Sequence, residues 1–310
     1  MPLVSMTEIV GAARAAGRGL GAFNVIGIEH AEAIVTGAEI ACAPAVLQIS
    51  ENCVAYHGAL EPIAAACLAL ARSAGAPVAV HLDHAERPEL VRAAADLGIG
   101  SVMFDASGLP YQENVRATAD VAAWCHGRGV WVEAELGEVG GKDGVHSPHA
   151  RTNPVEAAEY VAATGVDALA VAVGSSHAML TRDAVLDLAL IADIRNAVGV
   201  PLVLHGSSGV PDRVLAAAVG AGMTKINIAT QLNKVFTGAV RDYLAAEPAA
   251  VDPRRYGKAG RNAVAAEVAR LLDLLGSESV VQEGVVGPRD QAADADVMAG
   301  GVGEPLSPVE

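Results

Sequence analysis

The sequence predicts an α/β fold, a (β/α)8 or TIM barrel, on three observations. Short runs of Val, Ile, Leu and Ala recur along the chain, and each ends in a polar residue. Segments with apolar residues at helical spacing lie between these runs, and eight strand–helix units span about 255 residues, the usual size of such a barrel. No G-x-G-x-x-G motif follows the first run, and the alternative, a doubly wound open sheet, rarely needs eight units.

Each predicted strand is a short run rich in Val, Ile, Leu and Ala. In chain order the strands are Leu20–Asn24, Ala45–Ser50, Val78–Leu82, Ser101–Asp105, Val130–Glu135, Ala168–Val173, Leu202–His205 and Lys225–Ile228. Several intervening segments carry proline in the first turn, where a helix tolerates it because the missing N–H would have no partner there. The predicted helices include Glu61–Ala74, Pro88–Leu97, Asn114–Gly127, Pro154–Thr164, Pro211–Gly220 and Gln231–Leu244.

The chain has 310 residues, with 21 Lys plus Arg against 36 Asp plus Glu, a formal charge of −15. That charge repels nucleic acid and anionic membranes, while 52% hydrophobic and 18% charged residues suffice for a full core. No apolar run approaches the length of a transmembrane helix, and the first residues carry no secretory signal, so we expect a cytoplasmic protein. Four cysteines without paired spacing predict buried, reduced thiols.

The end of the chain differs in composition from the rest. Residues 277–310 hold seven acids and one arginine, with no lysine and no aromatic residue, among scattered glycine and proline. Such a segment buries too little apolar surface to offset its conformational entropy. We therefore expect a barrel catalytic domain over residues 1–276 and a mobile acidic tail over residues 277–310 that takes little part in the chemistry.

Polar residues end the predicted strands, at positions that packing alone does not explain. In a barrel the carboxyl ends of the strands, with the loops after them, form the active site. These positions carry Asn24, Ser50, Asp83, His84, Asp105, Glu135, His177, His205 and Asn227. Three histidines on separate strands, beside carboxylates, converge on one spot by the geometry of the barrel, and this predicts a metal site.

The donor types point to zinc. His84, His177 and His205 supply three imidazoles and leave the fourth position open, which is the usual composition of a catalytic zinc site. Asp83 directly precedes a ligand, so strand alternation predicts that its carboxylate points to the other side, toward the substrate. His81 has the same parity as Asp83 and either orients it by a hydrogen bond or simply faces the barrel interior.

Two loops of small residues predict phosphate binding. Gly206–Gly209 follows the seventh strand and Asn227–Thr230 the eighth, and each loop leads into a predicted helix. The loops after strands seven and eight commonly bind phosphate in barrels, where backbone N–H groups and a helix dipole attract the anion.

Together these residues resemble one family, the class II, zinc-dependent ketose-bisphosphate aldolases, which include fructose- and tagatose-bisphosphate aldolases. The resemblance covers about residues 1–275. Its most specific segments are Val80–Ala85, Val132–Gly137 and the pair Gly140-Gly141. The supporting segments are Ala22–Asn24, Ser101–Ser107, Leu204–Gly209 and Lys225–Thr230.

The resemblance implies a cleavage of a ketose 1,6-bisphosphate and a set of roles. Zn2+ would lie on the three histidines, with Asp105 among the metal residues and Glu135 near a second or resting metal position. Asp83 would exchange the proton of the C4 hydroxyl, and Asn227 would help to hold the enediolate. The phosphates and the rest of the substrate would contact Asn24, Ser50, Gly174, Ala178, Gly206, Ser207, Ser208, Gly209, Asn227, Ile228, Ala229, Thr230 and Arg254. Members also often bind a monovalent cation, Na+ or K+, near a phosphate, and form dimers or tetramers.

Three positions bear on the activity and the substrate. Ala178 stands where the family usually has glycine, and Asp143 stands where it has the mobile-loop glutamate that moves a proton. Ala229 is typical of the tagatose-specific members, so tagatose is favoured slightly over fructose. Another phosphorylated keto-sugar or keto acid stays open as the substrate, as does a catalytically impaired barrel that only binds sugar phosphates.

Two other enzyme classes are alternatives. A Schiff-base aldolase would need Lys225, which lies inside the eighth strand, as its nucleophile, and it would leave the histidines without a role. A zinc hydrolase of the barrel type usually places H-x-H at the end of the first strand, where this chain has Phe23-Asn24.

Overall fold

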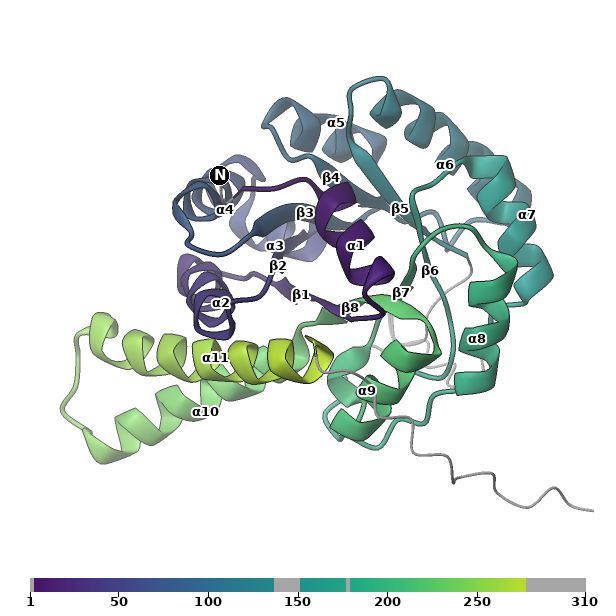
Figure 1. Cartoon of the computed structure of the whole chain (residues 1–310). Helices are drawn as coiled ribbons and strands as arrows, with labels where there is room; N and C mark the ends of the chain where they lie inside the picture. Colours follow the sequence, from purple (N-terminus) through teal and green to yellow (C-terminus); the bar gives the residue numbers. More distant parts are fainter. Residues whose placement is uncertain (1–2, 137–150, 177–178, 277–310) are drawn as a thin grey trace, which may run out of the picture. The chain divides into compact units, whose positions relative to one another are not determined.

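The computed structural model describes residues 3–136, 151–176 and 179–276. Within them eight parallel strands form a closed barrel in chain order, in which β1 pairs with both β2 and β8 (Figure 1). The strands are β1 Leu20–Asn24, β2 Ala45–Ser50, β3 Val78–Ala85, β4 Ser101–Phe104, β5 Trp131–Glu135, β6 Ala168–Ala170, β7 Leu202–Leu204 and β8 Met223–Ile228. The predicted (β/α)8 fold is therefore confirmed.

Helices alternate with the strands and cover the outside of the barrel (Figure 1). They are α1 Met6–Ala15, α2 Ile28–Ala41, α3 Glu51–His57, α4 Glu61–Ser73, α5 Pro88–Asp96, α6 Tyr111–His126, α7 Pro154–Thr164, α8 Leu188–Ala197, α9 Asp212–Ala221, α10 Thr230–Ala246 and α11 Pro253–Gly276, with a 3-10 turn η1 at Ser207–Gly209. The larger apolar core fills the space between these helices and the outer face of the strands.

Helix α1, which the sequence analysis did not predict, covers the end of the barrel where the strands begin (Figure 1). Its apolar residues pack against inward-facing residues near the strand starts and form a second apolar cluster, which we call the barrel floor. The barrel floor consists of Met6, Ile9, Val10, Ala13, Leu20, Ala22, Val46, Ala79, Trp131, Ala168, Ala170 and Val203. The interior is thus a packed core at this end.

Strands β3 and β6 differ from the predicted ranges for identifiable reasons. Strand β3 continues to Ala85 because the chain after Leu82 keeps pairing with β4 across a register shift. Strand β6 ends at Ala170, three residues early, because the backbone of Ala172 bonds Thr152 instead: its carbonyl accepts from the Thr152 N–H, and its N–H donates to the Thr152 hydroxyl.

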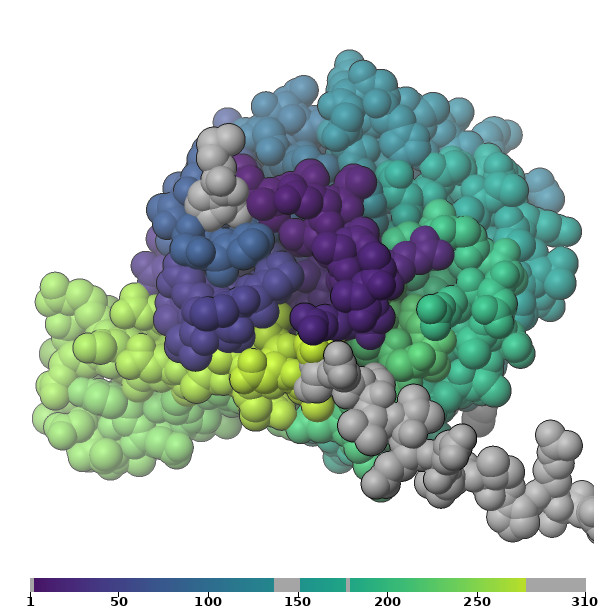
Figure 2. Space-filling view, in the orientation of Figure 1, coloured from purple at the N-terminus to yellow at the C-terminus, as the bar shows by residue number. Residues whose placement is uncertain are grey.

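The last two helices, α10 and α11, form a hairpin, and α11 packs against α2 (Figures 1 and 2). A glycine permits this close approach, since a Cβ on Gly37 would lie 2.7 Å from the backbone oxygen of Ala265. Arg261 of α11 and Glu32 of α2 form an ion pair of 2.6 Å. The Gly19 N–H donates to the carbonyl of Leu275, so the end of α11 is bonded to the segment that enters β1.

The four cysteines are free thiols. Cys53, Cys67 and Cys125 are buried as predicted, and burial raises the pKa of Cys53 and Cys125 to about 11 and that of Cys67 to about 12. Cys42 is exposed, contrary to the prediction, because it ends α2 in a left-handed backbone conformation at the surface.

Among the described helices, none is by itself long and apolar enough to cross a membrane, and the one pair that meets the length and composition together, α3 with α4, is bent by 116°. The predicted acidic tail, residues 277–310, lies outside the described residues, so the division at residue 276 stays a prediction.

Candidate active site

Histidine and carboxylate side chains gather at the carboxyl ends of the strands, as the sequence predicted. Two groups of three residues each have possible ligand atoms that lie within 4.8 Å of one another. One group is Asp83, His84 and His205, and the other is His84, Asp105 and Glu135, so His84 belongs to both. The five residues come from β3, β5 and the segments directly after β4 and β7. His177, the third predicted imidazole, lies outside the described residues, as do Ala178 and Asp143.

The backbone of His84 explains how two consecutive residues reach the same cluster. Strict alternation predicts that Asp83 and His84 point to opposite sides of β3, and this expectation is wrong. His84 has φ 49°, a left-handed conformation that is uncommon outside glycine, and it lies where the register of β3 against β4 shifts. This irregularity brings both side chains to one point, and such local strain concentrates at functional sites.

Two amides hold the carboxylate of Asp83. Asn24 Nδ2 donates to Asp83 Oδ2 at 3.1 Å and Asn227 Nδ2 to Oδ1 at 3.4 Å. Gln48 in turn donates to Asn24 Oδ1 at 3.1 Å, which fixes the orientation of that amide. Burial alone would raise the pKa of Asp83, but His84, Lys225 and the neighbouring imidazoles outweigh it and lower the pKa below its ordinary value. The two amides therefore hold the Asp83 carboxylate in one orientation.

His81 does not orient Asp83, contrary to one of the two interpretations of the sequence. Its Nδ1 lies 2.5 Å from Ser101 Oγ, and its ring is fully buried in the barrel interior against Trp131. Burial, with the nearby Lys225 charge, lowers the pKa of His81 to about 3, so the ring is neutral.

A buried ion pair that the sequence analysis did not identify lies beneath the cluster. Lys225 Nζ donates to Glu133 Oε2 at 2.8 Å, and the other oxygen of Glu133 is 3.0 Å from His205 Nε2. All three side chains are fully buried. Glu133 could have been found from strand alternation, because it shares the inward face of β5 with Glu135.

The contacts of His205 define which of its ring atoms faces the cluster. Nε2 is directed at Glu133, whereas Nδ1 is 3.3 Å from Glu135 Oε2. Burial would lower the pKa of His205, but the hydrogen bonds to Glu133 and Glu135 dominate and raise it to about 10. A carboxylate on the far ring nitrogen is the arrangement that orients histidine ligands in metal sites.

Asp105 makes the corresponding contact to His84. Asp105 Oδ2 lies 2.7 Å from His84 Nδ1, and the backbone N–H and hydroxyl of Ser107 donate to Oδ1 at 3.1 and 2.6 Å. Asp105 therefore has the contacts of a residue that orients His84. The family resemblance implies only that Asp105 is among the metal residues and does not make this distinction.

The two predicted phosphate loops lie side by side. Ser208 Oγ accepts from the backbone N–H groups of Ala229 and Gln231 at 3.3 and 3.1 Å, which joins the loop after β7 to the start of α10. Gly206 has φ 66°, and a Cβ there would lie 2.5 Å from the Ser176 carbonyl, so only glycine fits this turn. Ser207 is buried and donates to the Leu204 carbonyl. Ile228 and Thr230 flank Ala229 in the adjoining loop, at the junction of β8 and α10.

Of the remaining predicted substrate residues, Ser50 and Gly174 lie at or just after the carboxyl ends of strands, whereas Arg254 does not. Ser50 caps α3 by accepting from the Cys53 N–H, and Gly174 turns the chain after β6 with φ 116°. Arg254 lies instead in the first turn of α11, with an 89% exposed side chain bonded to Asp252. The connection between α10 and α11 is at the outer end of their hairpin, away from the strands (Figure 1). Within one chain the structure does not bring Arg254 to the cluster.

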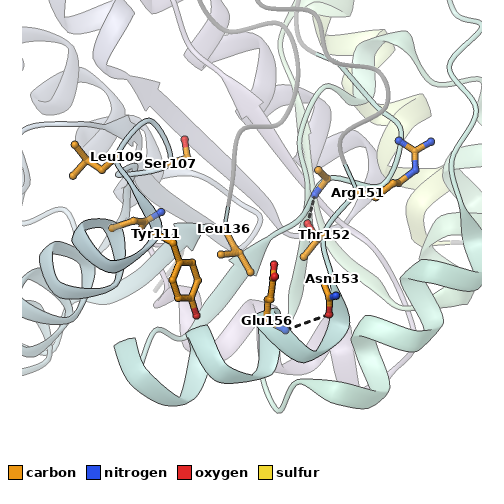
Figure 3. A pocket seen from close by; sticks show the side chains of 10 residues that line it. Ser107, Leu109, Tyr111, Leu136, Arg151, Thr152, Asn153 and Glu156 are labelled. Atoms are coloured by element: carbon orange, nitrogen blue, oxygen red, sulfur yellow. Dashed lines mark hydrogen bonds between the residues drawn. The ribbon is translucent and has the colours of Figure 1, made fainter.

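A cavity of about 330 Å³ opens beside the cluster, between the loops that follow β4 and β5 (Figure 3). Ser107, which bonds Asp105, forms one wall, and Leu136, which directly follows Glu135, forms another. The other lining residues are Leu109, Tyr111, Asn114, Arg151, Thr152, Asn153, Glu156 and Ala172.

The donor set fits a divalent metal ion. Imidazole nitrogen combined with carboxylate oxygen suits zinc, and the second-layer carboxylates that orient both histidines are those expected of such a site. The fold and the cluster are thus those of a barrel enzyme with a candidate metal site at the carboxyl ends of its strands.

Comparison with known proteins agrees with this class. The family model described as "Fructose-bisphosphate aldolase class-II" matches residues 4–279. The chain is 40% identical over 281 residues to the fructose-bisphosphate aldolase of Geobacillus stearothermophilus, which covers 89% of this chain and 98% of that protein. The chain therefore belongs to the class II fructose-bisphosphate aldolase family, and it is a lyase.

Solved structures show the same fold. The YdjI aldolase from Escherichia coli K12 is 30% identical, with a TM-score of 0.79 over 89% of this chain and 98% of that one. The fructose-bisphosphate aldolase of Campylobacter jejuni is 21% identical, with a TM-score of 0.73 over 88% of this chain and 95% of that one, and at this identity the likeness concerns the fold alone.

Proposed function

We propose that this protein catalyses the zinc-dependent, reversible aldol cleavage of a ketose 1,6-bisphosphate to dihydroxyacetone phosphate and glyceraldehyde 3-phosphate. One observation carries the proposal. Asp83, an oriented carboxylate, lies in one cluster with His84 and His205 in a chain of the class II aldolase family. A base beside a metal site is the combination that retro-aldol chemistry requires.

The reaction assigns a proton transfer to Asp83. In cleavage, its carboxylate takes the proton of the C4 hydroxyl, the C3–C4 bond breaks, and C4 becomes the aldehyde of the leaving product. The electron pair of that bond passes to C3 and the C2 carbonyl as an enediolate, which takes up a proton at C3 to give dihydroxyacetone phosphate. In condensation, Asp83 returns the proton. The amides of Asn24 and Asn227 keep the carboxylate in place for both directions. A metal ion bound at the cluster supplies Lewis-acid polarisation of the C2 carbonyl.

The metal would be held by His84 and His205, with His177 as the third imidazole and Glu135 beside a second position. The Lys225–Glu133 pair supports this metal mechanism against Schiff-base chemistry, because the Lys225 amine is fully buried and is engaged in a hydrogen bond to Glu133. One phosphate would bind at Gly206–Gly209 and Asn227–Thr230, with a monovalent cation nearby, as the family resemblance implies. Arg254 would meet the distal phosphate only if it is supplied by another subunit of a dimer or tetramer.

Two features favour different sugars. Ala229 favours tagatose 1,6-bisphosphate, whereas the name of the relative from Geobacillus stearothermophilus favours fructose 1,6-bisphosphate. The test is coupled detection of dihydroxyacetone phosphate released from each sugar, before and after EDTA treatment and after zinc is added back. Cleavage that is lost with EDTA and restored by zinc supports the proposal, and the ratio of the two kcat/KM values identifies the sugar.

The opposite results are equally informative. Cleavage that resists EDTA would overturn the zinc mechanism. Absence of cleavage of both sugars by zinc-loaded protein would favour another phosphorylated keto-sugar or keto acid, or a barrel that only binds sugar phosphates.

Replacement of the base tests the assignment directly. We expect Asp83→Asn to lower kcat by a factor of about 10²–10⁴, because the amide cannot accept the C4 proton while it keeps the size of the side chain. Asp187→Asn, which alters an exposed helix cap on α8, is the matched control and should leave kcat unchanged. Both variants should retain zinc, measured by metal analysis. Equal kcat in the two variants would remove Asp83 from the mechanism.

A further inference from the structure

A closed polar network lies behind the end of β5, outside the cluster itself. Its members are Tyr160 on α7 and Asn114 and Thr118 on α6, which are 0%, 2% and 0% exposed. Tyr160 is the largest fully buried side chain among the described residues. Its hydroxyl oxygen lies 2.7 Å from Asn114 Oδ1 and 3.1 Å from Thr118 Oγ1. A buried tyrosine hydroxyl needs such partners, because an unpaired one costs free energy on folding.

The distances determine how the Asn114 amide is oriented. Tyr160 has one hydroxyl proton, and the shorter contact assigns it to Asn114 Oδ1, which also accepts from Thr118 Oγ1 at 3.0 Å. With two hydroxyl donors on Oδ1, the Nδ2 group faces the other way and donates to the backbone carbonyl of Glu135 at 3.2 Å. Burial raises the pKa of Tyr160 further above its ordinary value, so the hydroxyl stays a donor at every working pH.

This bond is made at the last residue of β5. The pairing of β5 with β6 ends at the same place, with Glu135 opposite Ala170. The Glu135 carboxylate lies 3.3 Å from His205 Nδ1. Its position therefore depends on the backbone at the end of β5, which Asn114 fixes by its hydrogen bond to the Glu135 carbonyl. The network therefore reaches the cluster through the backbone of Glu135, by the bond from Asn114 Nδ2.

We propose that Tyr160, acting through Asn114, is a positioning residue that fixes the end of β5 and so holds the Glu135 carboxylate opposite His205 for metal binding. The inference rests on the proposed metal site. A positioning role for Tyr160 can be distinguished from a packing role by measurement. Loss of a packing contact would lower the stability of the protein but leave the affinity of the cluster for metal unchanged.

The test compares two hydroxyl deletions on the same helix. Tyr160→Phe removes the donor to Asn114 and keeps the ring. Thr164→Val removes a buried hydroxyl that donates to the Tyr160 carbonyl at 2.7 Å, a bond within α7 rather than one to β5. Full-length proteins are stripped of metal, and zinc affinity is measured by competition with a chromogenic chelator. The visible spectrum of the Co2+-loaded proteins reports the geometry of the site.

We expect Tyr160→Phe to weaken zinc binding about 5-fold and to alter the Co2+ spectrum, while Thr164→Val leaves both unchanged. The effect should be smaller than the 10–100-fold typical of groups bonded directly to a ligand, because Tyr160 acts through one further residue. Thr118→Val removes the second donor to Asn114 and should also weaken zinc binding. This variant tests the inference if Tyr160→Phe does not fold.

Zinc affinities of Tyr160→Phe and Thr118→Val equal to that of Thr164→Val would overturn the inference and leave the metal site intact. Failure of the unmodified protein to bind zinc would overturn the proposed function, and this inference with it.

Discussion

The two ends of the barrel interior use the same strands in opposite ways. At the floor, the inward positions of β2, β3 and β5 are Val46, Ala79 and Trp131, packed against α1. Two residues farther along each strand, the same face carries Gln48, His81 and Glu133, all buried. Side chains in a strand alternate with a period of two, so one step of two residues along the strands changes an apolar layer into a polar layer, in which Glu133 pairs with Lys225.

The two layers therefore contribute in different ways, the barrel floor to stability and the polar layer to the candidate active site. The floor is held by apolar burial, which is non-directional and depends mainly on volume. In the polar layer the buried charge of Glu133 requires its partner, because an uncompensated buried charge costs several kcal/mol. Substitutions in the two layers should therefore differ in size and in what they disturb.

The largest effect is expected in the polar layer. Lys225→Met should destabilise the protein by about 3–5 kcal/mol, because it leaves the Glu133 carboxylate buried without its cation. The measurement is urea unfolding of the metal-free protein. The matched control is the double variant Lys225→Met/Glu133→Gln, which removes both charges and should recover more than half of the loss. A single variant that costs less than about 1 kcal/mol would show that the pair is not isolated from solvent.

A substitution in the floor should cost less and leave the site unaffected. Met6 is 1% exposed and belongs to α1, far along the barrel axis from the cluster. We expect Met6→Ala to lower the free energy of unfolding by about 2–4 kcal/mol through loss of apolar contact and a residual cavity. Met6→Leu, of similar volume, should cost less than about 1.5 kcal/mol. Zinc affinity should not change in either variant, and a change in it would show that the two layers are coupled.

A partly exposed charge cluster provides the smallest effect. Asp212 bonds Arg182 and Arg270, and although burial would raise its pKa, these arginines outweigh burial and lower it. Because the folded-state pKa lies below the unfolded value, the stabilisation is present above about pH 4 and is lost as the pH falls through the folded-state pKa. Asp212→Asn should cost about 0.5–1 kcal/mol at pH 7, since solvent screens these groups, and less as the pH falls toward 2. Thermal unfolding at both pH values is the measurement, and an equal cost at pH 2 would contradict it.

The sequence predicted the barrel well because its signals are local. Leu20–Asn24 and Ala45–Ser50 match β1 and β2 residue for residue, since apolar runs bounded by polar residues are read without tertiary information. Helix α1 was missed although the sequence contains a usable signal. Ser5 accepts from the Glu8 N–H, and Ser-x-x-Glu before an apolar stretch is a helix start.

The errors at the site have a different origin. The position of His84 beside Asp83 depends on a left-handed backbone conformation and on a register shift between β3 and β4. Because both arise from pairing with another strand, the order of residues along β3 does not predict them. The partner of His81 is likewise a residue of β4, Ser101, and could not be chosen from parity along β3 alone. The residue types and strand ends were predictable, whereas the pairwise contacts required the closed barrel.

The closure of the barrel has a consequence for how the chain is made. Strand β1 pairs with β8, and the ion pair between Glu32 and Arg261 joins residues that are 229 positions apart. Contacts of such long sequence separation form late and slow folding. During synthesis, β1 presents an unpaired strand edge until β8 has left the ribosome, and such an edge invites aggregation. The open edge of β1 therefore stays available for pairing with other chains until β8 is made and closes the barrel.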